Sequence, residues 1–198
     1  MRLGLVADVH CNTAALQQAV DELGSDVDEI LVAGDALFDY RFSNETLECI
    51  REHELRYVVG NHELGLLGKD GERARAAPTV RAENLEFLTN VPTRLEATVG
   101  GKRLLMVHAS PWAPYNQYLM PSSPELDRCD ELDVDILVLG HTHLPMAVRR
   151  GRTLVVNPGS LGHSREKDHR GSVTYGILDT ESGELEVRRF ENPLLAVT

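Results

Sequence analysis

The chain has 198 residues, of which 42% are hydrophobic and 26% charged; this composition excludes a disordered chain and allows a substantial core. Its formal net charge of −11 repels polyanions, so we expect no binding to duplex nucleic acid or to anionic membranes. A small phosphorylated substrate is not excluded, because bound cations can reverse the sign of the field inside a cleft.

No internal repeat, low-complexity tract or flexible linker divides the sequence, so we predict one domain over residues 1–198. The three cysteines, Cys11, Cys49 and Cys129, form no C-x-x-C pair, and their odd number argues against a disulfide framework. The apolar stretch before Asp8 is too short for a signal peptide or a membrane span. We therefore expect a cytoplasmic protein; its oligomeric state stays open.

Short apolar runs alternate with longer amphipathic stretches in the first part of the chain. This alternation predicts parallel strands joined by right-handed helical crossovers. The expected strands are Leu3–Ala7, Ile30–Ala33 and Tyr57–Val59, and the expected helices are Thr13–Leu23 and Asn44–Glu54. Asn12 or Thr13 can cap the first helix, and Ser43 or Asn44 the second.

The remaining chain predicts further strands with two more helices. One helix lies near Arg81–Thr89 and another begins at Ser123-Pro124-Glu125, while Gly100-Gly101 indicates a hairpin. The expected strands are Leu95–Val99, Arg103–Val107, Ile136–Leu139, Met146–Arg149, Leu154–Val156, Ser172–Leu178 and Leu185–Phe190. Together the elements predict an α/β fold in which two mixed sheets form a sandwich with helices outside.

Polar residues that can bind metal follow the ends of predicted apolar strands by at most two residues. Ligand sites in α/β sheets lie beyond the carboxyl ends of the strands, so such residues converge on one rim. The residues in this position are Asp8, Asp35, Asn61, His108 and His141.

Taken singly, most of these motifs are weak. Asp8-Val9-His10 places two possible ligands on one side of an extended segment, but it also fits a capping Asp beside an exposed His. Gly34-Asp35 commonly marks a turn, and a lone His108 beside a core strand is more often structural.

Two motifs after later strands are more informative. In Gly60-Asn61-His62-Glu63, Asn61 can offer a carbonyl oxygen to a metal while His62 stays free for acid–base work; a polar turn fits about equally well. Gly140-His141-Thr142-His143 is the strongest single motif, because H-x-H after a buried strand is typical of metal sites.

The whole set indicates a metal centre with mixed oxygen and nitrogen ligands. Such ligands favour Mn, Fe, Zn, Co or Ni over Ca or Mg, and the lack of cysteine ligands argues against a structural zinc site. The H-E-x-x-H, Walker A and G-x-S-x-G patterns are absent. His53, His163 and His169 are expected to lie elsewhere.

The ordered blocks D-x-H, G-D, G-N-H-[DE], H and G-H-x-H resemble the calcineurin-like metallophosphoesterases, specifically their small YfcE-like phosphodiesterase branch. The resemblance implies a four-layered α/β/β/α sandwich with two divalent metal ions, with Mn²⁺ as our first expectation. The first metal would be held by Asp8, His10, Asp35 and His143, and the second by Asp35, Asn61, His108 and His141. His62 would face the scissile phosphate without binding metal.

Three positions depart from the family's usual pattern. Cys11 replaces a glycine, which adds a side chain that could narrow the cleft or an oxidisable thiol. The segment after Asp35 lacks the family's glycine, so the phosphate-binding arginine of the protein phosphatases is not transferred to Arg41. Glu63 replaces the commoner Asp at a supporting position.

We therefore expect a hydrolase of small phosphodiesters, in which a metal-bridging hydroxide attacks phosphorus in line and His62 protonates the leaving group. Asn61, His62 and Arg165 are candidate substrate contacts, and Arg170 is another; for the two arginines, a place on the surface without a role in binding fits at least as well. A phosphomonoesterase, a protein phosphatase, a dinucleoside polyphosphate hydrolase and a non-catalytic scaffold of the same fold are the alternatives. Specificity is expected in loops around Asp39–Asn44, Leu64–Pro78 and Pro111–Pro124.

Overall fold

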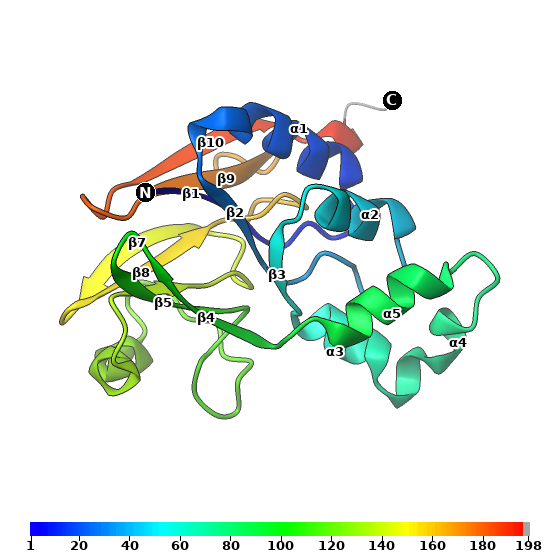
Figure 1. The fold of residues 1–198 in the computed structure, drawn as a ribbon, viewed down its shortest axis with the longest axis horizontal. Helices are drawn as coiled ribbons and strands as arrows, with labels where there is room; N and C mark the ends of the chain where they lie inside the picture. Colours follow the sequence, from blue (N-terminus) through cyan, green and yellow to red (C-terminus); the bar gives the residue numbers. More distant parts are fainter. Residues whose placement is uncertain (196–198) are drawn as a thin grey trace.

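Two five-stranded mixed β-sheets form the centre of the protein in the computed structural model, which describes residues 1–195 (Figure 1). The first sheet has the order β10-β9-β1-β2-β3 and comprises β1 (Arg2–Val6), β2 (Glu29–Ala33), β3 (Arg56–Val58), β9 (Ser172–Asp179) and β10 (Leu185–Glu191). The second has the order β4-β5-β6-β8-β7 and comprises β4 (Arg94–Val99), β5 (Lys102–Val107), β6 (Ile136–Val138), β7 (Pro145–Arg150) and β8 (Thr153–Pro158). This arrangement confirms the predicted pair of mixed sheets.

Helical crossovers make β1, β2 and β3 parallel. Helix α1 (Thr13–Leu23) begins where the Asn12 side chain accepts a hydrogen bond from the Ala15 N–H at 3.3 Å, as predicted from its capping residue. Helix α2 (Asn44–Glu52) is capped in the same way by Ser43 and ends two residues before the predicted boundary.

Three α-helices and a short 3-10 helix (Lys69–Gly71) connect β3 to β4, and only one of them was predicted. Helix α5 (Ala82–Asn90) matches the expectation to within one residue at each end. Helices α3 (Asn61–Leu67) and α4 (Glu72–Arg75) occupy the segment expected to be a loop around Leu64–Pro78. Both helices are shorter than two turns, so they are too short for a helical periodicity of apolar residues to reveal them.

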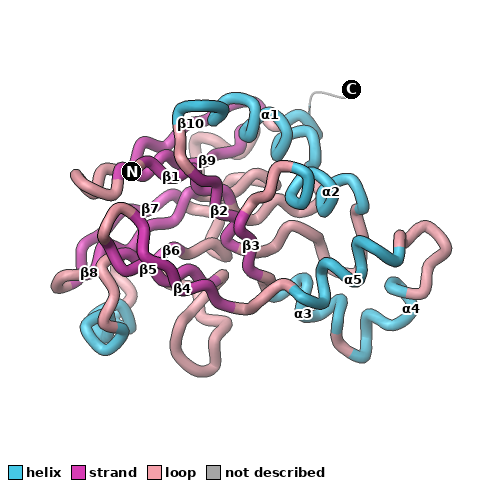
Figure 2. The backbone as a smooth tube through the Cα atoms, in the orientation of Figure 1, coloured by secondary structure: helices cyan, strands magenta, loops and turns pink. Residues whose placement is uncertain are grey.

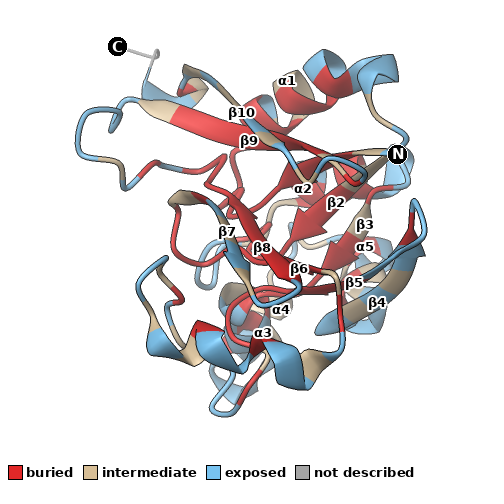
Figure 3. Cartoon of the chain, turned by 90° about the vertical axis from the view of Figure 1, so that its left-hand side faces the viewer, coloured by how far each residue is buried: buried red, intermediate tan, exposed pale blue. Residues whose placement is uncertain are grey.

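One core lies between the two sheets and is formed by buried side chains of both inner faces. Leu3, Leu5 and Leu31 of the first sheet pack in one cluster with Met106 and Val138 of the second. A larger buried cluster joins the first sheet to α1 and α2. The inner strands β1, β6, β8 and β9 are mostly buried, whereas the outer strands β4, β7 and β10 carry exposed residues (Figure 3).

The outer face of the second sheet is covered by a 3-10 helix over Pro124–Leu132, where an α-helix was expected. Leu126, Cys129 and Leu132 are spaced by three residues and all pack in the cluster under this face. In a 3-10 helix, residues i and i+3 lie directly above one another, so this spacing presents one apolar edge to the sheet.

The strands gather in the middle of the molecule and the helices lie at its periphery (Figure 2). Strands β1, β2 and β3 of the first sheet and β5 and β6 of the second are followed by the segments that carry the predicted metal ligands. Within residues 1–195, no helix has the length and apolar character needed to cross a membrane.

Candidate metal centre

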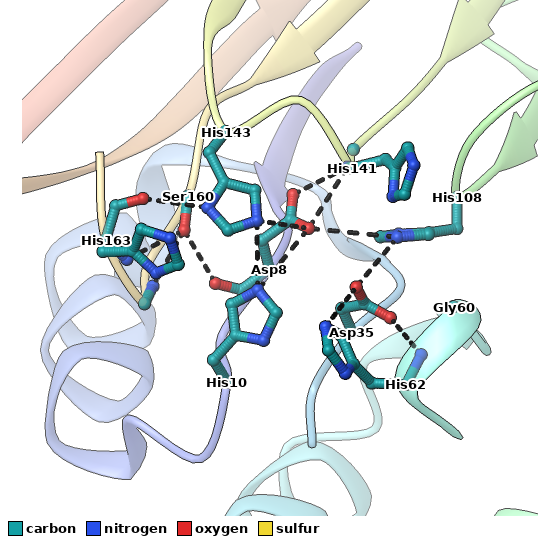
Figure 4. A network of polar contacts seen from close by, with 12 residues as sticks. Asp8, His10, Asp35, Gly60, His62, His108, His141, His143, Ser160 and His163 are labelled. Atoms are coloured by element: carbon teal, nitrogen blue, oxygen red, sulfur yellow. Dashed lines mark hydrogen bonds and ion pairs between the residues drawn. The ribbon is translucent and has the colours of Figure 1, made fainter. Parts of the chain in front are cut away.

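The predicted metal ligands lie together where strands of both sheets end (Figure 4). All are buried except Asn61, which is exposed at the first turn of α3. The seven residues are Asp8, His10, Asp35, Asn61, His108, His141 and His143. They form two groups on opposite sides of the Asp8 and Asp35 carboxylates.

In the first group, nitrogen and carboxylate oxygen atoms face one another. The Nε2 atoms of His10 and His143 are 3.1 Å apart, and Asp8 Oδ1 lies 3.3 Å from His143 Nε2. His143 Nδ1 lies 3.0 Å from the carbonyl oxygen of His163, which can only accept, so Nδ1 carries the ring proton. The lone pair of His143 Nε2 therefore points at His10 and Asp8.

In the second group, too, histidine nitrogens face oxygen atoms of neighbouring side chains. His108 Nδ1 donates to the Ala33 carbonyl oxygen at 2.8 Å, which leaves Nε2 facing Asp35 Oδ2 at 3.0 Å and Asn61 Oδ1 at 3.1 Å. His141 Nε2 is buried and has no hydrogen-bond partner among residues 1–195. Asp35 belongs to this group and also to a cluster with His10 and His62.

These donors fit divalent metal ions. Lone pairs and carboxylates that point at one another repel unless a cation lies between them, and outer carbonyls that fix the histidine tautomers are typical of metal sites. Burial lowers the pKa of His10 to about 3 and that of His141 to about 4, which keeps both rings in the neutral form that binds metal.

Asp35 and His108 shift each other's pKa. Burial by itself lowers the pKa of His108, but the charge of Asp35 outweighs it and raises that pKa to about 9. Burial likewise opposes ionisation of Asp35, yet His108 holds its pKa at about 2. Without a metal ion, a proton on His108 thus balances the Asp35 charge, and a cation would displace that proton.

Asp35 is oriented by the first turn of α3. Its Oδ1 accepts the His62 backbone N–H at 3.0 Å. The buried Glu63 carboxylate accepts backbone N–H groups of Asp35, Leu37 and Gly60 at 3.0, 2.7 and 2.6 Å. Glu63 thus ties the β2 loop to the start of α3, which confirms the supporting position expected for it.

The backbone around the ligands is unusual. Five of them have left-handed conformations, with φ between 51° and 68°, and so does Cys11 with φ 62°. Residues other than glycine rarely adopt this region, and such residues cluster at functional sites. The five ligands are Asp8, His10, Asp35, His141 and His143.

Gly34 leaves room for His108. A Cβ atom at Gly34, where φ is +88°, would lie 2.4 Å from His108 Nδ1. We expect Gly34→Ala to displace the His108 ring and weaken binding of one metal ion by about 10–100-fold. Isothermal titration with Mn²⁺ measures this loss. Gly65→Ala is the matched control, because its Cβ would meet no atom within 4 Å; equal affinities in the two variants would contradict the prediction.

His62 is more accessible than the buried histidines, with 20% of its side chain exposed against 5% for His10 and His143. Its Nδ1 lies 2.9 Å from both the backbone nitrogen and a carboxylate oxygen of Asp39. A ring without a proton on Nδ1 accepts from the amide, and a ring with that proton donates to the carboxylate. Asp39 can therefore hold the His62 ring in place whether or not Nδ1 carries a proton.

The expectation that His163 lies away from the site is wrong. Its ring centroid is 4.3 Å from that of His143 and 5.6 Å from that of His10, and the three could share a metal ion. The buried Ser160 hydroxyl donates to the Asp8 carbonyl oxygen at 2.9 Å and accepts the His163 N–H. This turn holds His163 beside Asp8. The contact between Asp39 and His62 was not predicted from the sequence either.

Two further sequence expectations have clear outcomes. Arg165 lines a cavity of about 290 Å³ over the ligands, together with Tyr118, whereas Arg170 does not line it. Cys11 neither lines this cavity nor offers a reactive thiol, so both expectations for it are wrong. Its side chain packs in the core cluster near α1, and burial raises its pKa to about 11.

A sandwich of two mixed sheets with two carboxylates and buried imidazoles at one rim provides a candidate site for divalent metal ions. The sequence profile of the calcineurin-like phosphoesterase superfamily domain matches residues 1–183. The chain belongs to this family and is a metal-dependent phosphoester hydrolase.

Individual proteins are also similar to this chain. An uncharacterized protein of Methanocaldococcus jannaschii is 28% identical over 96% of this chain and 87% of its own length. The phosphodiesterase YfcE of Escherichia coli is 34% identical over 80 residues, which are 40% of this chain and 36% of that protein. The crystal structure of a metallophosphoesterase from Sphaerobacter thermophilus has a TM-score of 0.80 at 24% identity and covers 99% of this chain and 91% of that one.

Proposed function

We propose that the protein is a binuclear phosphodiesterase that hydrolyses small phosphodiesters. The observation that supports it best is the position of Asp35 between two groups of metal-competent atoms, one with His10 and His62 and one with His108 and His141. A carboxylate shared in this way can bridge two cations. The YfcE relative, a phosphodiesterase by name, supports the diester substrate.

Two bound cations would lower the pKa of a water molecule and neutralise charge on the phosphate oxygens. The protein's own contribution is position and proton transfer. Asp8, Asp35 and the neutral histidines would set where the cations bind. His62, exposed to the 290 Å³ cavity, would donate a proton to the departing oxygen, and Asp39 would hold its ring in place.

The phosphate would lie in the cavity over the ligands. The cavity volume of about 290 Å³ suits a phosphate with small substituents. The lining includes the amide of Asn61, the ring of His62 and the guanidinium of Arg165. These three groups can each contact a phosphate oxygen. Mn²⁺ is the proposed metal, with Fe, Zn, Ni and Co as alternatives, because the ligand set mixes imidazole and carboxylate.

A substrate panel tests the proposal. With Mn²⁺ we expect hydrolysis of bis-p-nitrophenyl phosphate with a kcat/KM well above that for p-nitrophenyl phosphate, and no hydrolysis in excess EDTA. Metal analysis should find two ions per chain. A phosphomonoesterase or a protein phosphatase would prefer the monoester or a phosphopeptide. A scaffold would hydrolyse none of them, and that outcome would overturn the proposal.

A further inference from the structure

A second cavity adjoins the one over the metal ligands. Its volume is about 440 Å³, within the range of about 300–1,000 Å³ that is usual for sites of organic ligands. Asn61 lines both cavities, so they meet at its side chain. His108, whose Nε2 faces Asp35, also lines the second cavity. Any group bound there lies next to the reacting phosphate.

The walls of this second cavity are mainly apolar and include two side chains that water reaches. Leu64 of α3 is 51% exposed and Tyr115, in the loop after β5, is 67% exposed. Pro111 and Pro114, which precede Tyr115 in the same loop, also line the cavity. Solvent-exposed apolar side chains grouped around a hollow are typical of a binding site.

The cavity has little positive charge with which to bind a second anionic group. Arg94 is its only cationic lining residue, and the guanidinium is already paired with the Glu96 carboxylate. Arg165 lies in the neighbouring cavity, over the metal ligands. A polyphosphate chain would need several cations along its path, whereas an uncharged ring finds an aromatic face at Tyr115 and apolar contacts at Leu64.

The two cavities also separate the two arms of a diester. His62 lines the cavity over the ligands and does not line the second one. If His62 protonates the leaving oxygen, the leaving arm lies on its side of the phosphate. The arm that stays on phosphorus is then the one directed past Asn61, toward Leu64 and Tyr115.

We propose that this second cavity binds the retained arm of the substrate, an uncharged, ring-bearing group of aryl or nucleoside size that packs between Leu64 and Tyr115. This inference rests on the proposed phosphodiesterase function. It narrows that function to diesters with one such arm, and it disfavours dinucleoside polyphosphates as substrates.

The kinetic test compares two diesters that share the p-nitrophenyl leaving group, one with a thymidine 5′-yl retained arm and one with a methyl arm. Wild-type protein should favour the thymidine diester by at least about tenfold in kcat/KM, because one stacked ring usually strengthens binding by at least that factor. Leu64→Ala/Tyr115→Ala should lower this ratio to about two, mainly through KM. Leu194→Ala, 53% exposed and outside both cavities, is the control.

A binding measurement keeps the test independent of turnover. Trp112, the single tryptophan, lies in the same loop between Pro111 and Pro114, so a nitrophenyl group in the cavity should quench its fluorescence. Bis-p-nitrophenyl phosphate should quench Mn²⁺-loaded His62→Ala, and adding Leu64→Ala/Tyr115→Ala should weaken its Kd by about tenfold. An unchanged Kd, or a wild-type preference below twofold, would overturn the inference. Quenching without wild-type hydrolysis would contradict only the proposed function.

Discussion

His62→Ala should retain two metal ions per chain and lose about 10²–10⁴-fold in kcat, the usual contribution of a general acid. The backbone N–H that His62 donates to Asp35 Oδ1 at 3.0 Å survives in alanine, so the ligand stays oriented. Metal analysis together with steady-state hydrolysis of a diester with an unsubstituted phenyl leaving group separates the two effects.

The leaving group provides a further check on His62. Diesters of more acidic phenols need less protonation of the departing oxygen, so the loss should be smaller for them. His169→Ala is the matched control, because this histidine is exposed and lies outside the cavity over the ligands. Full activity of His62→Ala would end the assignment of an acid role to this residue.

Asp35→Asn should lose both the metal pair and the activity. Asparagine keeps an oxygen that can accept the His62 N–H, but it removes the negative charge placed 3.0 Å from His108 Nε2. Without this charge two cations cannot be held close together, because their mutual repulsion is no longer offset. Plasma emission analysis after gel filtration should find one ion or fewer per chain.

Asp168→Asn serves as the matched control for Asp35→Asn, since Asp168 is exposed and belongs to none of the three candidate metal clusters. Circular dichroism of both variants establishes that the fold is retained. Two ions bound to folded Asp35→Asn would show that Asp35 does not bridge, and the binuclear proposal would then need another shared ligand.

The sequence could predict the strands and the convergence of the ligands for the same physical reason. Strands buried on both faces leave continuous apolar runs, and polar residues directly after such runs must lie at the sheet's edge. Asp8, Asp35 and His108 follow their strands in this way. All ten strands are present, with boundaries shifted by two residues at most.

Other parts of the site depend on contacts between distant segments and leave no local pattern. His163 reaches the ligands because the Gly162 N–H donates to the Asp8 carbonyl oxygen at 2.7 Å, across more than 150 residues of sequence. Asp39 meets His62 through the folding of the loop after β2. The turn-forming sequence Asn157-Pro158-Gly159-Ser160 lies close to His163, but it does not indicate which distant residues the turn contacts.

The ligands come from both sheets: Asp8, Asp35 and Asn61 follow strands of the first, and His108 and His141 follow strands of the second. Bound cations would therefore act as reversible cross-links between the two sheets. Like a disulfide, they would join distant segments of the chain, but the number of cross-links would depend on the supply of metal. Separating the sheets would dismantle the coordination shell, so metal occupancy and cooperative unfolding are linked. In a cell short of the metal, the protein would lose activity and its free energy of unfolding would fall.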